Sequence, residues 1–465
     1  MQTKTNVSVD VLNRIREMAS VDYQNAVPIA TANAGVIRDI GAIIMDSPNL
    51  QNEFLNCLIN RIGKVIITSR LFESPLKMFV KGNLEYGEVV EELFVNICRP
   101  YQYSPSKAEQ EVFKRVIPDV RSAFHVLNSE LFYKQTVSRK ELDKAFLSID
   151  GVESLARAII GCMYVSASYD EFLVMKYQIA KAALDGTIAI VPVATLNSEA
   201  NGKAALTAFK EYSNNFEVLS TAYNVMGVYN SSDKASQYLI TDNHNDAYLS
   251  ANVLAALFGP AFADADYKKI RVDNFDQFDN DRLKWILGKD NDDEWTAFTS
   301  DELAALANIE AVLLDENWFQ VYYKLLETRY LENPEGLSEN TWLHIWRIFS
   351  RSPFANIVIF GSGTNGVSAV AIDDSTVPPI TAGTAGSATI DVDVTLAGLV
   401  PKGAKILDYS VALSNGATGK ASINEAGLLT WDKDFTAADT ITVTVKSRID
   451  ATKTDSATIT VEAST

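Results

Sequence analysis

The chain has 465 residues, of which 47% are hydrophobic and 10% aromatic, and its formal net charge at pH 7 is −18. This length favours two or three domains, and this hydrophobic content excludes a mainly disordered chain. Nucleic-acid phosphates are bound chiefly by Lys and Arg, so the acidic balance argues against a broad nucleic-acid-binding surface.

The start of the chain and its cysteines bear on the cellular compartment. Residues 1–10 are polar and lack the basic and apolar regions of a secretory signal. No window contains the roughly 18 consecutive apolar residues of a membrane helix. Cys57, Cys98 and Cys162 are odd in number and lie far apart in apolar settings. We therefore expect buried, reduced thiols in a cytosolic product.

Residues 1–65 are expected to form an arm followed by a helix. Pro28 favours extended geometry in the residue before it, which predicts an extended segment at residues 27–32. Apolar residues recur at helical spacing from residue 50 to residue 62. A β-branched strand is expected next, at residues 64–67.

A long two-stranded ribbon is predicted from the segments that follow. Residues 76–81 precede Gly82 and Asn83, and residues 87–97 are another strand candidate. An isolated ribbon is marginally stable, so we expect this one to lie on its own domain or on a neighbouring molecule. A short helix is predicted at residues 138–148.

Residues 150–186 form a candidate helix that is long enough to cross a whole domain. Asp150 and Glu153 give a helix start signal, and Gly186 gives a stop signal. About 35 helical residues span roughly 50 Å. The alternative is two shorter helices, broken near Gly161 or at residues 166–168. The face opposite the apolar stripe carries charged residues such as Lys176, which argues against a membrane span.

An α/β layer domain is predicted after this helix, because strand and helix patterns alternate. The expected strands are residues 187–193, 238–241, 269–272 and 309–314, and the expected helices are residues 204–212 and 246–258. Residues 273–294 are rich in Asp and Asn and are expected to form an exposed loop that residues 283–287 anchor. Residues 318–360 are dense in aromatic side chains, which favours packing in a core or between subunits over a stacking platform for bases or sugars.

The composition changes sharply at Gly361. Apolar and polar residues alternate at residues 390–396, 441–445 and 457–461, between Gly-rich and Asn-rich turns, which predicts a small antiparallel sandwich. Residues 361–366 spell a dinucleotide-binding fingerprint, Gly-Ser-Gly-Thr-Asn-Gly. A phosphate cradle requires a helix at that point, and none is expected before Pro378, so we interpret the run as a linker.

Signals for catalysis or metal binding are missing from the sequence. Asp276, Asp279 and Asp281 lack the central Gly and closing Glu of a calcium loop. The three histidines, His125, His244 and His344, lie far apart without ligand spacing, and structural roles are expected for His125 and His344. We expect no catalytic residue, no metal and no cofactor.

Several segments resemble the major head protein of phi29-type short-tailed bacteriophages, in order over about residues 27–360. They are residues 27–33, 46–65, 75–82, 107–125, 132–136, 310–319, 333–337, 344–346 and 351–356. The resemblance implies an α+β protein with an HK97-type capsid fold and a C-terminal all-β Ig-like sandwich. That fold has an N-terminal arm, an extended loop, a peripheral domain with a long spine helix, and an axial domain.

The domain division that the resemblance implies has five parts. Residues 1–65 are the N-terminal arm and helix, and residues 66–137 are the extended-loop region and the start of the peripheral domain. Residues 138–360 hold the spine helix, the axial domain and the return to the peripheral domain. Residues 361–368 are a linker, and residues 369–465 are an Ig-like domain of the BIG2 type.

The function that the resemblance implies is that of a major capsid protein, not an enzyme. Such a chain assembles into pentamers and hexamers of an icosahedral or elongated head around double-stranded DNA, in the host bacterial cytoplasm and then in the virion. The expected partners are further copies, a scaffolding protein, a portal or connector at one vertex, and DNA contacted weakly and non-specifically, with no membrane. Contacts between subunits are expected at Leu76, Lys77, Phe79, Lys81, Asp292 and Asp293.

Two alternatives stay open at this stage. One is an encapsulin-like nanocompartment shell, which would need an enzyme cargo. The other is a bacterial surface adhesin with an Ig-like module, which would need an export signal.

Overall fold

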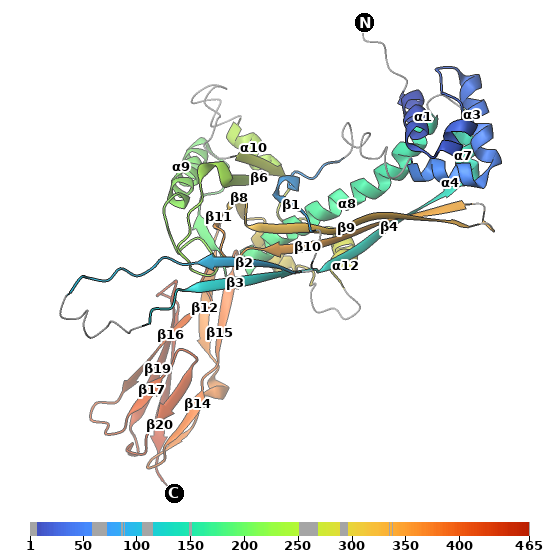
Figure 1. Cartoon of the computed structure of the whole chain (residues 1–465). Coiled ribbons are helices and arrows are strands. Elements are labelled where there is room, and N and C mark those ends of the chain that lie inside the picture. Colours follow the sequence, from blue (N-terminus) through green and yellow to red (C-terminus); the bar gives the residue numbers. More distant parts are fainter. Residues whose placement is uncertain are drawn as a thin grey trace.

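The computed structural model describes residues 7–57, 72–84, 87, 89–104, 115–147, 151–250, 268–288, 296–333, 335–336 and 338–464. A helical module at the N-terminal end, a central α+β body and a C-terminal all-β domain follow one another (Figure 1). The long helix α8 runs from the N-terminal module into the body.

The N-terminal module is built from α1 (Val7–Met18), α2 (Val21–Ala26), α3 (Ala34–Asp46) and α4 (Pro48–Cys57). The side chains of Ser20 and Asn33 cap α2 and α3, because each accepts a hydrogen bond from a first-turn amide. The module has its own core, with contributions from α7 (Arg139–Ala145). The expected arm is therefore mainly helical; the link between α2 and α3 is non-helical, as predicted, and residues 64–67 lie outside the described part of the chain.

Close packing inside this module depends on Gly41 of α3. A Cβ atom at Gly41 would lie 2.4 Å from the Cβ of Phe146, which is far inside van der Waals contact. Ser138 and Glu141 form a capping box that starts α7, so the short helix predicted from residue 138 is confirmed. These two features fix α7 against α3.

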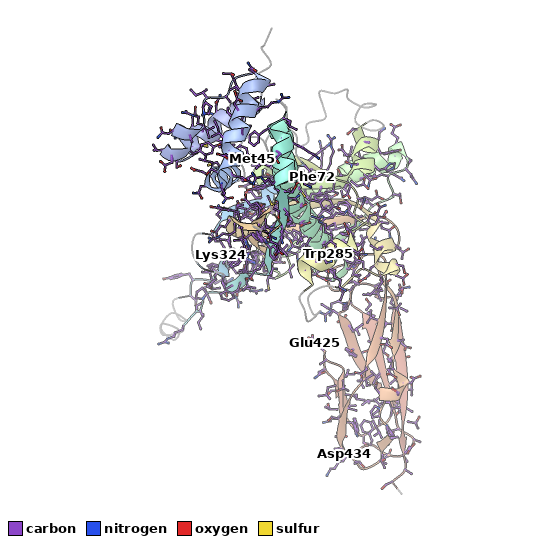
Figure 2. The ribbon with its side chains drawn as sticks, turned by 90° about the vertical axis from the view of Figure 1, so that its right-hand side faces the viewer. Met45, Phe72, Trp285, Lys324, Glu425 and Asp434 are labelled. Atoms are coloured by element: carbon purple, nitrogen blue, oxygen red, sulfur yellow. The ribbon has the colours of Figure 1, made fainter. Side chains whose placement is uncertain are left out.

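Helix α8 (Gly151–Leu184) is a single helix of 34 residues, so the prediction of one long helix is confirmed. Gly186 follows it with a φ of +74°, the left-handed conformation that ends helices. Two charged residues of the predicted polar face, Asp170 and Lys176, are buried, and so is their neighbour Glu171. Phe72 packs edge-on against Tyr169 and Phe172 of α8, at ring-centroid distances of 6.0 and 6.1 Å (Figure 2).

Two sheets form the body around α8. The first has the strand order β1-β9-β10-β4 and consists of β1 (Val80–Asn83), β9 (Phe319–Asn333), β10 (Ser338–Arg351) and β4 (Ser129–Ser138). It packs on α8, where Met163 and Ala167 contact a cluster with Leu343 and Ile345. The second has the order β5-β11-β8-β6-β7 and consists of β5 (Ala189–Pro192), β11 (Ile357–Gly361), β8 (Ile309–Asp315), β6 (Gln237–Asp242) and β7 (Lys268–Val272).

Helices cover the five-stranded sheet, as an α/β layer requires. Phe209 and Phe216 of α9 (Glu199–Phe216) share a buried cluster with Leu313 and Phe360 of the sheet. The second expected helix begins earlier than predicted, as α10 (Asn243–Tyr248), and residues 251–267 lie outside the described ranges. The sheet is mixed, because β8 is antiparallel to both of its neighbours.

In its described part, residues 273–288, the polar segment after β7 is only partly a solvated loop: Gln277 and Asp281 are exposed, as expected, but its start is fixed to α8. The Lys176 ammonium donates hydrogen bonds to both carboxylate oxygens of Asp273, at 2.9 and 3.0 Å, and to the Asn274 side-chain oxygen at 2.9 Å. Helix α12 (Asn280–Leu287) buries Leu283 and Ile286, so the predicted anchor is confirmed. Asp279 caps this helix, which explains its place better than a calcium loop does. Helix α13 (Ser300–Leu306) precedes β8.

The C-terminal strands form three small sheets around one core. The sheets are β13-β20-β19-β16, β14-β18-β17 and β12-β15. The strands are β12 (Gly366–Ile372), β13 (Ile380–Thr381), β14 (Gly386–Thr389), β15 (Val392–Ala397), β16 (Leu407–Leu413), β17 (Ala421–Ile423), β18 (Leu428–Trp431), β19 (Thr440–Ser447) and β20 (Thr454–Glu462). Alternate residues of β19 and β20 are buried, as predicted. Glu425 and Asp434 lie in this domain, away from the body (Figure 2).

The connection to the C-terminal domain is short, because β11 ends and β12 begins within the segment that was expected to be a linker. Gly361 ends β11 and Gly366 begins β12, so strand structure enters the segment expected as a linker. No helix follows the glycine run in this described segment, which agrees with the rejection of a dinucleotide site.

The aromatic residues pack as the sequence predicted, but the cysteines do not. The cysteines are thiols, but Cys98 and Cys162 are exposed and Cys57 is half-buried, so the expectation of burial is wrong. Aromatic residues of 318–360 do pack in the core, where Trp318, Phe319, Phe349, Phe354 and Phe360 are buried. In the described ranges, no helix is both long and apolar enough for a membrane crossing.

Candidate assembly surface

A β-ribbon projects from the body. In the sequence, it lies between the N-terminal module and α8. It consists of β2 (Val89–Val95) and β3 (Val120–Val126), which pair antiparallel from Val89 opposite Val126 to Val95 opposite Val120. The expected pairing of residues 76–81 with 87–97 is wrong, because β1 pairs with β9 and β2 pairs with β3. Sequence reasoning missed β3, although its alternating pattern, Val-Arg-Ser-Ala-Phe-His-Val, is a strand signal.

One side of the ribbon, the inner face, is fixed to the body. The His125 ring lies 2.7 Å from the Ser350 hydroxyl through Nδ1 and 3.2 Å from the Glu92 carboxylate through Nε2. The Ser352 hydroxyl donates to the same carboxylate at 2.8 Å. His125 is buried and hydrogen-bonded at both ring nitrogens, so its expected structural role is confirmed.

Further contacts hold the inner face where the ribbon leaves the body. The rings of Phe94 and Phe354 are stacked, with centroids 5.4 Å apart and planes 20° apart. Arg121 donates to the backbone carbonyl of Met226 at 2.6 Å. The inner face is therefore satisfied within its own chain, by both polar and apolar contacts.

The opposite side of the ribbon, the outer face, is mostly apolar and open; its two other residues are Glu91 and Ser122. Strand alternation places the odd-numbered residues of β2 and the even-numbered residues of β3 on this face. Its apolar residues have exposed fractions of 52% (Val89), 63% (Leu93), 63% (Val95), 51% (Val120), 62% (Phe124) and 53% (Val126). Single exposed apolar residues are ordinary, but six of them gathered on one face mark an interaction site.

Further exposed apolar residues lie in the segments beyond the paired strands. Ile97, Tyr101 and Tyr103 follow β2, and Val116 and Ile117 precede β3; all five are exposed, Tyr103 at 91%. A two-stranded ribbon with an apolar outer face is an aggregation hazard for an isolated chain. The apolar outer face is therefore best explained as a surface that another chain covers.

Of the six residues expected at subunit contacts, the structure describes four, and two of these four are not at the surface. Leu76 and Phe79 are fully buried in their own chain, where the Phe79 ring packs on Tyr238 and Phe319 at 4.9 and 5.1 Å. Their side chains cannot reach a neighbour in this arrangement, because the body core already encloses them.

The lysines among these six residues are exposed. The Lys77 ammonium lies 2.5 Å from Glu73, and this hydrogen bond lowers the pKa of the Glu73 carboxyl. The Lys81 ammonium donates to the Asn317 side chain at 2.7 Å. Asp292 and Asp293 lie outside the described residues. A role in assembly stays a prediction for these four residues.

A buried polar network between α8 and the four-stranded sheet holds the body together. Arg347 of β10 lies 3.5 Å from the Glu171 carboxylate and donates to the Ala167 carbonyl at 3.0 Å. The Tyr323 hydroxyl donates to Glu171, and burial raises the pKa of that carboxyl. Beside it, the Asp170 carboxylate accepts hydrogen bonds from Tyr133 and from Arg282 of α12. The network ties α8 to three strands and to α12.

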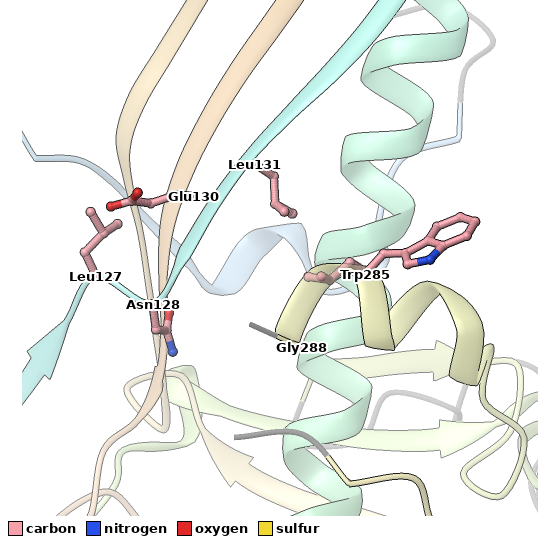
Figure 3. Close-up of a pocket in the computed structure, with 7 residues that line it drawn as sticks. Leu127, Asn128, Glu130, Leu131, Trp285 and Gly288 are labelled. Carbon is pink, nitrogen blue, oxygen red and sulfur yellow. The ribbon is translucent and has the colours of Figure 1, made fainter. Parts of the chain in front are cut away.

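A hollow of about 410 Å³ lies at the base of the ribbon, where β3 turns into β4 (Figure 3). Leu127, Asn128, Glu130 and Leu131 line one side, and α12 lines the other. The indole of Trp285, which is 75% exposed, points away from Leu131 in this view. Glu130 is the charged residue of the lining, so the hollow lacks the converging charged groups of a cofactor site.

Metal chemistry is not indicated in the part of the chain that the structure describes. There, no group of three or more His, Cys, Asp or Glu side chains is arranged to hold a metal ion. A rigid body, a fixed inner face and an open apolar face are features of a structural protein that associates with other chains.

Comparison with known proteins identifies the family. A model of the Phi29-like phage major capsid protein family matches residues 12–361. The chain is 33% identical over 362 residues to the major capsid protein of Bacillus phage B103. The alignment covers 77% of this chain and 73% of the B103 protein. The chain is 30% identical over 395 residues to the major capsid protein of Bacillus phage GA-1, with 83% and 75% covered. The chain therefore belongs to the Phi29-like family of phage major capsid proteins.

The same comparison defines the function at a general level. The chain is a major capsid protein of a tailed bacteriophage, and the family is structural rather than enzymatic. It is also 25% identical over 370 residues to the major capsid protein of Streptococcus phage Cp-1, which covers 77% of this chain and 95% of that one. Neither the nanocompartment shell nor the surface adhesin is retained as an alternative.

Two solved structures are similar to this one. The capsid structure of Staphylococcus phage Andhra has a TM-score of 0.48 and 15% identity, with 64% of this chain and 86% of that chain covered. The structure of the head fibre and inner core protein of bacteriophage P68 has a TM-score of 0.48 and 18% identity, with 63% and 85% covered.

Proposed function

We propose that the chain forms pentamers and hexamers that close into an icosahedral or elongated head, and that the outer face of the ribbon lies on a neighbouring subunit. The single observation that carries this proposal is the row of six apolar side chains on the outer face, each more than half exposed. An identical contact repeated head to tail closes into rings when the rotation between copies allows it.

The free energy expected for this contact is suited to the assembly of a shell. Full burial of a Val, Leu or Phe side chain contributes about 1.5–3 kcal/mol, and these residues are already half covered. Six of them therefore contribute roughly 6 kcal/mol of gross stabilisation to one contact. Such a contact is weak alone because association entropy opposes it, but every subunit in a shell makes several contacts at once.

The arrangement of the body supports an HK97-type fold in this proposal. The ribbon serves as the extended loop, α8 as the spine helix, the four-stranded sheet as the peripheral domain and the five-stranded sheet as the axial domain. The division into residues 1–65, 66–137, 138–360, 361–368 and 369–465 belongs to the same proposal. Its support is the order of the elements along the chain and the separate cores of the N-terminal module and of the C-terminal strands.

The C-terminal strands are proposed to form an Ig-like domain of the BIG2 type, which stands on the outer surface of the shell. Their sheets enclose a core that contains Leu429, Phe435, Ile441, Val443 and Ile459. The family model ends at residue 361, so this domain lies beyond the matched part of the chain.

The remaining partners follow from capsid assembly. We propose a scaffolding protein during assembly in the host cytoplasm, a portal or connector at one vertex, and double-stranded DNA that the shell contacts weakly. The net charge of −18 is consistent with a shell that does not hold DNA tightly.

Electron microscopy of the purified chain, with and without a scaffolding protein, tests the proposal. Closed shells or rings of five and six subunits are expected. If only monomers are found across a range of salt concentrations and with scaffolding protein present, the proposed assembly is refuted.

A further inference from the structure

The C-terminal domain is attached to the body by more than its chain connection. In the loop between β15 and β16, the Val400 amide donates to the Ala183 carbonyl at 3.0 Å. The Lys402 amide donates to the Ile188 carbonyl at 2.8 Å, and Leu399 is fully buried in the body core. Ala183 lies in the last turn of α8, where carbonyls lack partners within the helix. The loop thus completes the end of α8 and fixes the domain there.

The side chain of Lys402 continues from this attachment into a second loop of the body. Its ammonium donates to the backbone carbonyl of Asn224, and burial lowers the pKa of Lys402. We define the junction loop as residues 223–230. Asn224 is buried and closes this loop, because its side chain donates to the Val228 carbonyl at 2.8 Å and accepts from the Val228 amide at 2.9 Å.

The junction loop in turn holds the ribbon. Arg121 of β3 donates to the Met226 carbonyl at 2.6 Å, and the Tyr229 amide donates to the Asn96 side chain at 3.3 Å. Asp119 accepts hydrogen bonds from both Arg121 and Asn96, at 3.2 and 3.1 Å. A continuous series of contacts therefore runs from Lys402 through Asn224 and Met226 to the ribbon. In Figure 1, the ribbon and strands β12 and β15 are all drawn below β8 and β11.

We propose that Lys402 is a positioning residue through which the C-terminal domain sets the direction of the ribbon. This inference rests on the proposed function, in which the ribbon lies on a neighbouring subunit. A two-stranded ribbon is marginally stable by itself, so its direction depends on the contacts at its base. A hydrogen bond from a charged donor is stronger than a neutral one, so Lys402 holds the junction loop firmly. The C-terminal domain then serves assembly from within each subunit, in addition to any role on the shell surface.

Hydrogen–deuterium exchange of unassembled subunits tests the inference, because exchange reports local opening. Lys402→Met is expected to speed exchange about tenfold in residues 223–230 and in both ribbon strands, a factor in the range of one lost charged hydrogen bond. Lys402→Arg keeps a charged donor and is expected to retain wild-type exchange in the ribbon. Lys405→Met is the matched control, since Lys405 is an exposed lysine in the same loop.

The converse variant keeps the test decisive if Lys402→Met folds poorly. Arg121→Met is expected to speed exchange in the ribbon and to leave the C-terminal strands unchanged. The double variant is then expected to exchange less than additively in the ribbon, because both changes break the series through Met226, while the Tyr229–Asn96 contact is a second link that Arg121→Met leaves in place. Wild-type ribbon exchange in Lys402→Met, or additive effects in the double variant, would overturn the inference. The readout uses single subunits, so it is independent of whether shells form.

Discussion

Phe124→Ala tests the outer face of the ribbon most simply, because the ring is 62% exposed and opposes Glu91 in the strand register. Complete burial of a Phe side chain contributes about 3 kcal/mol, so covering the exposed part contributes about 2 kcal/mol to each contact. That free energy corresponds to an association about 30-fold weaker at each contact. The threshold concentration for shell assembly, measured by light scattering and sedimentation, is therefore expected to rise by at least that factor.

The matched control for this variant is Phe94→Ala on the inner face of the same ribbon. Phe94 stacks on Phe354 of its own chain, so its loss is expected to lower the melting temperature of the subunit. Phe124→Ala is expected to leave the melting temperature of the subunit unchanged, because the side chain is 62% exposed in the single chain. Assembly of Phe124→Ala at the wild-type threshold would refute the assignment of the outer face.

Three further predictions concern the body. Arg347→Met leaves the buried Glu171 carboxylate without its cation. The free energy of unfolding, measured by urea denaturation, is expected to fall by about 3–5 kcal/mol. A loss below about 1 kcal/mol would contradict the role of the network. Burial raises the pKa of Glu171 above its usual 4.5, so near this pH the folded state binds more protons than the unfolded state. The stability that the protonated Glu171 contributes is therefore lost as pH rises through the raised pKa. Glu171→Gln is therefore expected to gain stability relative to wild type as pH rises above 4.5. A difference that is constant with pH would argue against this role of Glu171. Gly186→Ala places an alanine in the left-handed conformation, with its new Cβ 3.1 Å from the Val400 side chain. The variant is expected to destabilise the subunit by roughly 1–2 kcal/mol. An unchanged melting temperature would show that the turn can relax.

Local signals in the sequence were sufficient for part of the fold. The start and stop signals around residues 150–186 predicted α8, and alternation predicted β19 and β20, because a helix stripe and a strand face repeat over neighbouring residues. Ser138 and Glu141 likewise mark the start of α7 within four residues.

Long-range contacts account for what the sequence did not predict. β2 pairs with β3 across a segment of more than 20 residues, and no local pattern distinguishes that partner from residues 76–81. Asp170 and Lys176 were expected on a polar face, but Arg282 and Asp273, more than 90 residues further along the chain, supply the charges that allow their burial. The open outer face could be recognised only when the pairing showed which residues share a side.

Cryo-electron microscopy of assembled shells tests the central claim most directly, because it shows what covers the ribbon. We predict that Leu93, Phe124 and Val126 of each subunit lie buried against a neighbouring copy, while His125 and Phe94 keep their contacts within their own chain. Shells in which this face of the ribbon is open to solvent would contradict the account.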